Sequence, residues 1–115
     1  MRLEEKTIVT LYRVRQATFD ISFDKYDYTE NYGKFYNVGV YSNKSDAKME
    51  QTELSKTLLA AHKGYTLTNR GGENNLTVEN FNGGYRVELQ TIEIDKRNLL
   101  MDCDNNFYYE GSKIK

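Results

Sequence analysis

The chain has 115 residues, of which 29% are charged and 38% apolar, and its formal net charge is −1; these values are typical of one folded domain. The small net charge argues against a general nucleic-acid binder, which usually has a basic excess, and against a strongly acidic mimic of nucleic acid. There is no apolar run near the roughly 18 residues of a membrane span and no signal-peptide pattern, so we expect a single cytoplasmic domain over residues 1–115.

The N-terminal part of the chain predicts strands on either side of a long connection. Residues 6–16 alternate between two faces that both begin apolar, as in a central strand. Residues 17–23 continue the alternation, either as an extension of that strand or as a second strand after a bulge near Gln16 and Ala17. Residues 34–42 are rich in strand-forming side chains. We therefore expect a hairpin with an elaborated loop.

Residues 42–64 predict the main helix. Ser42 or Asn43 can cap its start, and capping by Asn43 places Asp46 at the third helical position, where its charge suits the helix dipole. Lys63 then falls in the last turn and Gly64 at the position that follows the helix. The predicted buried stripe consists of Ala47, Leu54, Leu58 and Ala61.

Three further strands are expected at residues 65–69, 75–81 and 85–95, and Asn82-Gly83-Gly84 predicts a tight hairpin between the last two. A bulge near Gln90 would bring Val87, Leu89, Ile92 and Ile94 to one side. A short hairpin is expected around residues 102–106. Together the elements predict an α+β fold in which one main helix packs across an antiparallel sheet.

The candidate chemical motifs are incomplete, and we predict no enzyme, metal site or cofactor. Asp102, Asp104 and Asn106 have the spacing of a calcium loop, but Phe107 and Lys113 replace the glycine and glutamate that such a loop needs. A polar turn is therefore expected there. The single histidine and single thiol are His62 and Cys103; we expect the first at the helix end and the second packed as a small apolar residue. One cysteine allows no intramolecular disulfide.

The glycine-containing stretches 70–75 and 82–84 lack the patterns of a P-loop and of a dinucleotide-binding turn. A pocket for a small nucleotide or signalling molecule beside Arg70 and Tyr85 is the alternative functional prediction.

The strongest functional signal lies in residues 20–36, where six aromatic side chains alternate with four carboxylates. Tyrosine is enriched at protein interfaces because it offers a large contact area with a polar end. The carboxylates would suit a partner with a basic surface. Two alternatives stay open: the tyrosines cover the domain's own core, or an edge strand pairs into a homodimer to which Tyr108 and Tyr109 contribute. The predicted partner-binding residues are Tyr26, Asp27, Tyr28, Glu30 and Tyr32.

A loose pattern of structural residues comprises Val38, Val40, Tyr41, Ser42, Ala47, Ile92 and Asp95. It resembles small uncharacterised phage and prophage accessory proteins of Gram-positive bacteria. In these proteins a strand that ends in Val-x-Val-aromatic-Ser precedes a capped helix with an early alanine. The resemblance implies a phage protein in the host cytoplasm and carries no site residues; residues 20–34 depart from it. We therefore predict a non-enzymatic phage or mobile-element protein that binds, and by binding inhibits, a host or defence protein.

Overall fold

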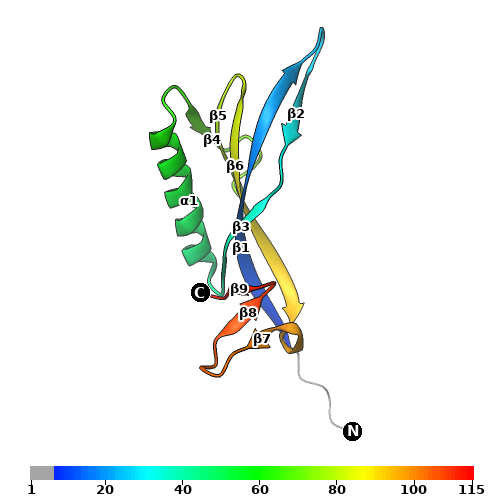
Figure 1. Ribbon diagram of the computed structural model, residues 1–115, viewed down its shortest axis with the longest axis vertical. Coiled ribbons are helices and arrows are strands. Elements are labelled where there is room, and N and C mark those ends of the chain that lie inside the picture. The colour runs from blue at the N-terminus through cyan, green and yellow to red at the C-terminus, as the bar shows by residue number, and fades with distance from the viewer. Residues whose placement is uncertain (1–6) are drawn as a thin grey trace.

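A computed structural model describes residues 7–115 and confirms the α+β fold, with one long helix against one face of an antiparallel sheet (Figure 1). The main sheet has the strand order β2-β1-β6-β5-β4, and β3 also pairs with β1. A small sheet, β7-β8-β9, forms the C-terminal part. The elements are β1 (Ile8–Phe23), β2 (Tyr28–Tyr32), β3 (Tyr36–Tyr41), α1 (Lys44–Ala61), β4 (Thr66–Thr68), β5 (Asn75–Asn80), β6 (Gly83–Asp95), η1 (Lys96–Asn98), β7 (Leu100–Met101), β8 (Phe107–Tyr109) and β9 (Ser112–Lys113).

The long strand β1 gives the molecule its elongated shape, which measures 65 × 30 × 21 Å. It pairs with β6 in unbroken register from Ile8 opposite Asp95 to Asp20 opposite Gly83. The first two predicted segments are therefore one strand, and the predicted start at Lys6 lies outside the described residues. The irregularity lies in the pairing with β3, near Val38, instead of near Gln16 and Ala17.

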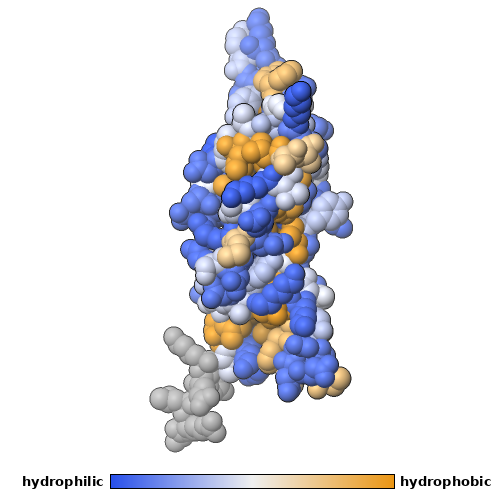
Figure 2. Space-filling view, turned by 90° about the vertical axis from the view of Figure 1, so that its left-hand side faces the viewer, coloured by the Kyte–Doolittle hydropathy of each residue, from blue (hydrophilic) through white to orange (hydrophobic). Residues whose placement is uncertain are grey.

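The helix begins as predicted, because the Asn43 side chain accepts a hydrogen bond of 2.8 Å from the backbone N–H of Ser45. It ends at Ala61, so Lys63 lies beyond its last turn, and Gly64 adopts a left-handed φ of +85°. The side of the molecule that α1 covers is mostly hydrophilic, with small separate hydrophobic patches (Figure 2).

The predicted buried stripe of α1 is correct in part. Ala47 is buried, and Leu54 and Leu58 pack against the core, but Ala61 is exposed. Gln51 and Ser55 are buried as well. The Gln51 amide donates hydrogen bonds of 3.0 Å to the backbone carbonyls of two residues on the sheet side, so its burial leaves no donor unpaired. The buried core on this face comprises Val14, Tyr41, Ala47, Val87 and Leu89.

The opposite face of the sheet carries a second apolar group, and the predicted bulge near Gln90 is wrong. Ile92 and Ile94 stand opposite Leu11 and Val9 in a regular ladder. Side chains alternate along a strand, so these four residues lie on the face away from Val87 and Leu89. The C-terminal sheet borders the same region, where Val9, Leu11, Leu99, Phe107 and Ile114 line a groove.

The β5–β6 hairpin is confirmed, with its turn one residue earlier than predicted. Asn80 pairs with Gly83, so Phe81 and Asn82 form the turn. Both glycines lie in β6, where other strands approach closely. A Cβ atom on Gly84 would lie 2.0 Å from the carbonyl oxygen of Val78, which no side chain can tolerate.

Candidate functional site

The segment that the sequence singles out forms a hairpin that projects from the sheet (Figure 1). The pairing of β6 with β1 ends at Asp20, and beyond it β1 pairs only with β2. The last pair is Phe23 opposite Tyr28. The end of the hairpin therefore has no neighbouring strand on either side.

A four-residue turn closes this hairpin, and an aspartate holds it together. The Asp24 carboxylate accepts hydrogen bonds from the backbone N–H groups of Tyr26 and Asp27, both at 2.9 Å. The Asp27 carboxylate accepts one of 2.7 Å from the N–H of Tyr28. Such local bonds are the usual reason for aspartate in a turn. These two carboxylates therefore have a structural role in addition to their charge.

Three rings stand exposed at the end of the hairpin; we call Phe23, Tyr26 and Tyr28 the aromatic tip. Their exposed fractions are 65%, 86% and 52%. The rings of Phe23 and Tyr28 lie 6.4 Å apart and are tilted by 48°, a separation at which aromatic pairs attract. Only Tyr26 extends beyond this pair, beside Lys25, whose ammonium lies 5.3 Å from the ring centroid.

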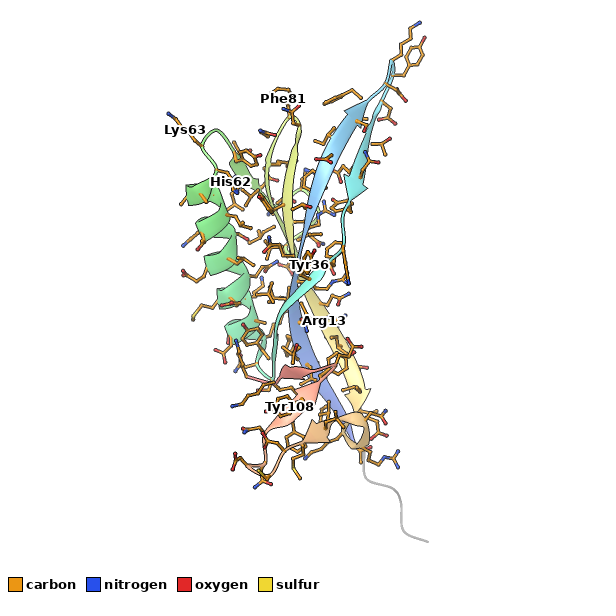
Figure 3. All side chains as sticks on the ribbon, in the orientation of Figure 1. Arg13, Tyr36, His62, Lys63, Phe81 and Tyr108 are labelled. Carbon is orange, nitrogen blue, oxygen red and sulfur yellow. The ribbon has the colours of Figure 1, made fainter. Side chains whose placement is uncertain are left out.

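A fourth exposed ring faces the aromatic tip from the β5–β6 turn. Phe81 is 73% exposed and stands at the end of its hairpin (Figure 3). A cleft of about 260 Å³ separates the two hairpins, with Phe23 and Tyr28 on one side and Phe81 on the other. Ile21 adds an apolar side chain, and ion-paired side chains including Arg70 complete the lining.

The base of the hairpin is tied to the sheet by an ion-pair network. Glu30 pairs with Arg70, lies 3.9 Å from the guanidinium of Arg86, and accepts a hydrogen bond of 2.8 Å from the Tyr32 hydroxyl. Arg70 also holds Glu79 through two hydrogen bonds of 2.7 and 3.0 Å. This fork geometry is the strong form of an arginine–carboxylate pair.

The network shifts the pKa values of its members. Burial acts to raise the pKa of Glu30, but the hydrogen bond from Tyr32 and the two guanidiniums outweigh it, so that pKa lies below its ordinary value. Burial, followed by the hydrogen bond to Glu30, raises the pKa of Tyr32 to about 12. Glu30 is therefore a carboxylate and Tyr32 a neutral donor at physiological pH.

Aromatic rings underlie the same arginines on this face of the sheet. The guanidinium of Arg86 lies 5.2 Å from the ring centroid of Tyr32, and that of Arg70 lies 5.7 Å from Phe19. Both distances are in the range of cation–π attraction. The rings of Phe19 and Tyr32 are themselves 5.2 Å apart, so the base of the hairpin packs on the sheet as well as pairing with it.

The five predicted partner-binding residues are thus divided between two environments. Tyr26 and Tyr28 belong to the exposed aromatic tip, and Asp27 lies in the turn beside them. Glu30 and Tyr32 belong to the network that binds the hairpin to the sheet. The structure does not bring all five to one exposed surface.

The alternative ligand-binding pair is separated by the sheet. Arg70 lies with Arg86 on the face of Glu30, whereas Tyr85 stands on the helix side, where its ring is 4.9 Å from that of His62. Neighbouring residues on β6 point to opposite faces, which places the side chains of Arg86 and Tyr85 on different sides. A small ligand cannot contact both Arg70 and Tyr85.

His62 lies at the helix end as expected, where it is the C-cap residue (Figure 3). The centroid of its ring lies 5.0 Å from that of Tyr65. The prediction for Cys103 is wrong, because its side chain is exposed. Cys103 is exposed because it lies in the predicted polar turn, away from the core. The Asp102 carboxylate holds this turn together by accepting hydrogen bonds from the backbone N–H groups of Asp104 and Asn106.

The chain matches no protein-family model, no curated protein and no solved structure. Within residues 7–115, no group of three or more His, Cys, Asp or Glu side chains could hold a metal ion. In the same range no helix is long and apolar enough to cross a membrane. The candidate site therefore rests on the geometry of the two hairpins.

Sequence reasoning missed two of the four exposed rings. Phe23 was expected within the strand segment of residues 17–23, and β1 does reach it, but β1 passes the end of the sheet before Phe23 and leaves it 65% exposed. The sequence analysis expected Phe81 as the last residue of the strand 75–81, whereas the structure places it in the turn, where it is 73% exposed. The hairpin signal Asn82-Gly83-Gly84, which follows Phe81 directly, could have indicated this position.

Proposed function

We propose that this protein is a non-enzymatic binding module that engages a partner protein through its aromatic tip, with Phe81 as an additional contact. The observation that carries the proposal is the grouping of Phe23, Tyr28 and Phe81 around one cleft, with Tyr26 in the turn beyond them, each at least 52% exposed. Exposed apolar groupings of this kind mark interaction sites. Binding energy at interfaces concentrates in a few such anchors.

The charge of the hairpin supports a basic partner. Between residues 20 and 29 the acidic side chains are Asp20, Asp24 and Asp27 and the basic one is Lys25, so this stretch has a net charge of −2. Complementary charge mainly speeds the encounter of two proteins and excludes wrong partners. That the partner is a host or defence protein, and that binding inhibits it, are further parts of the proposal that rest on the resemblance to phage accessory proteins.

A capture experiment with a matched control tests the proposal. The parent protein, a variant with Phe23, Tyr26 and Tyr28 replaced by Ala, and the single variant Tyr36→Ala are immobilised and exposed to a lysate of a Gram-positive host. Tyr36 is 65% exposed and lies outside the aromatic tip, so it controls for nonspecific adhesion to an exposed ring.

The proposal predicts a protein that the parent and Tyr36→Ala retain and the tip variant does not. Retention of the same proteins by all three would contradict it. A second possibility is that the partner of the aromatic tip is another copy of this chain. Sedimentation of the parent and of the tip variant, each on its own, tests this: a dimer that forms in the parent and dissociates in the tip variant would identify the second copy as the partner.

A further inference from the structure

A small hollow lies on the helix side of the sheet, where the projecting hairpin leaves β6. Asn80, Gly83 and Asp20 stand in one row across β5, β6 and β1, and the middle residue has no side chain. The next row whose side chains point to the same face contains Tyr85 on β6 and Thr18 on β1. The hollow has a volume of about 250 Å³, and Tyr65 and Asn82 complete its walls.

The walls of the hollow are held in place by their own contacts. The His62 ring packs against both tyrosines, at 5.0 Å from Tyr65 and 4.9 Å from Tyr85. The backbone N–H of Asn82 donates a bond of 2.9 Å to the Asn80 side chain. The shape is therefore largely formed in the absence of a ligand, which lowers the cost of binding.

Among the residues that the structure describes, Asp20 is the only carboxylate that lines the hollow. Within residues 7–115 no basic side chain forms an ion pair with it. In this respect Asp20 differs from four glutamates that each pair with an arginine on the other face of the sheet: Glu30, Glu79, Glu88 and Glu110. The hollow thus combines an unpaired negative charge with two tyrosine rings and amide groups.

We propose that this hollow binds the guanidinium group of an arginine side chain of the partner protein. A guanidinium is planar, can donate two parallel hydrogen bonds to one carboxylate, and stacks on aromatic rings. Asp20 and the tyrosines supply both kinds of contact. The inference rests on the proposed function, because the arginine belongs to the partner that the aromatic tip holds. The cleft at the tip lies on the opposite face of the sheet from Asp20, so this partner must reach around the projecting hairpin to place the arginine in the hollow.

A titration with small amino-acid amides tests whether the hollow binds a guanidinium group in the absence of the partner protein. Isotope-labelled protein is titrated with N-acetyl-arginine amide while the backbone amide signals of Gly83 and Gly84 are followed by NMR. N-acetyl-citrulline amide has nearly the same shape without the charge, and N-acetyl-lysine amide has the charge without the planar fork. We expect saturable shifts with the arginine amide and binding at least about tenfold weaker for citrulline, because a hydrogen bond to a charged group contributes more than a neutral one.

Variants locate the binding to Asp20. Asp20→Asn should weaken binding of the arginine amide by about tenfold or more, whereas Asp104→Asn, in an exposed turn elsewhere, should leave it unchanged. Equal binding of arginine and citrulline amides would overturn the proposal, as would equal binding of the lysine amide, no saturable shift at Gly83, or an unaffected Asp20→Asn variant. The tip variant should bind the amide like the parent, so failure of the hollow and failure of the aromatic tip give different results.

Discussion

Replacement of Glu30 by Gln tests whether the base of the hairpin belongs to the folded domain. The substitution keeps the shape of the side chain and removes the charge that pairs with Arg70 and faces Arg86. Loss of one partner of a buried ion pair typically costs about 3–5 kcal/mol. The Glu30 side chain is 16% exposed, Arg70 is 34% exposed, and Arg70 keeps its fork on Glu79. We therefore expect a loss of about 2 kcal/mol in the free energy of unfolding.

Urea unfolding followed by circular dichroism measures this loss, with Asp27→Asn as the control in the turn. An asparagine at position 27 can still accept the bond from Tyr28, so its effect should stay within about 0.5 kcal/mol. If Glu30→Gln also changes stability by less than about 0.5 kcal/mol, the hairpin base is not part of the domain and the division of residues 20–36 into base and tip is wrong.

The difference between the parent and Glu30→Gln should depend on pH in a defined direction. The pKa of Glu30 is lowered in the folded protein from its ordinary value of 4.5. A lowered acid pKa contributes stability that is fully present above the unfolded-state pKa and is lost as pH falls through the folded-state pKa. The two proteins should therefore differ most above about pH 5 and converge in stronger acid. A constant difference down to low pH would exclude the Glu30 charge as the cause.

Three further predictions concern the scaffold. Leu58→Ala should lower the free energy of unfolding by about 2 kcal/mol, the lower end for a leucine truncation, because Leu58 is only partly buried; an unchanged urea midpoint would contradict the packing of α1. Gly84→Ala should prevent folding or lower the thermal midpoint strongly, since its Cβ would lie 2.0 Å from the Val78 carbonyl oxygen, and a normal midpoint would refute this close approach. NMR titration should give a pKa of about 2 for Asp102, which hydrogen bonds from Asn106 and Tyr108 lower, and Tyr108→Phe should raise it; no change would exclude that bond.

Local signals made much of the fold predictable. Asn43 caps α1 through a bond to a residue two positions away, so a short stretch of sequence contains the whole interaction. The β5–β6 hairpin and the polar turn at residues 102–106 are local in the same sense. The α+β fold follows from these elements because one amphipathic helix and one sheet have few ways to bury their apolar faces.

Features that depend on distant residues could not be predicted. Gln51 is buried because it reaches the backbone of Asn74 and Val87, and its amide gives no sign of this in the sequence. Glu30 looked like a free surface charge because Arg70 is far from it along the chain. A period-2 pattern also does not show where the neighbouring strand ends, and that end separates exposed Phe23 from buried Phe19.

The same tip variant measured for stability and for binding tests the central claim most directly. Once capture has supplied the partner, its affinity is measured for the parent, for Tyr36→Ala and for the variant with Phe23, Tyr26 and Tyr28 replaced by Ala, together with each unfolding free energy. We predict that the tip variant loses at least about thirtyfold in affinity, as for a hot-spot cluster, while its stability stays within about 0.5 kcal/mol of the parent. Unchanged affinity, or a marked loss of stability, would show that these rings serve the fold and that the binding surface lies elsewhere.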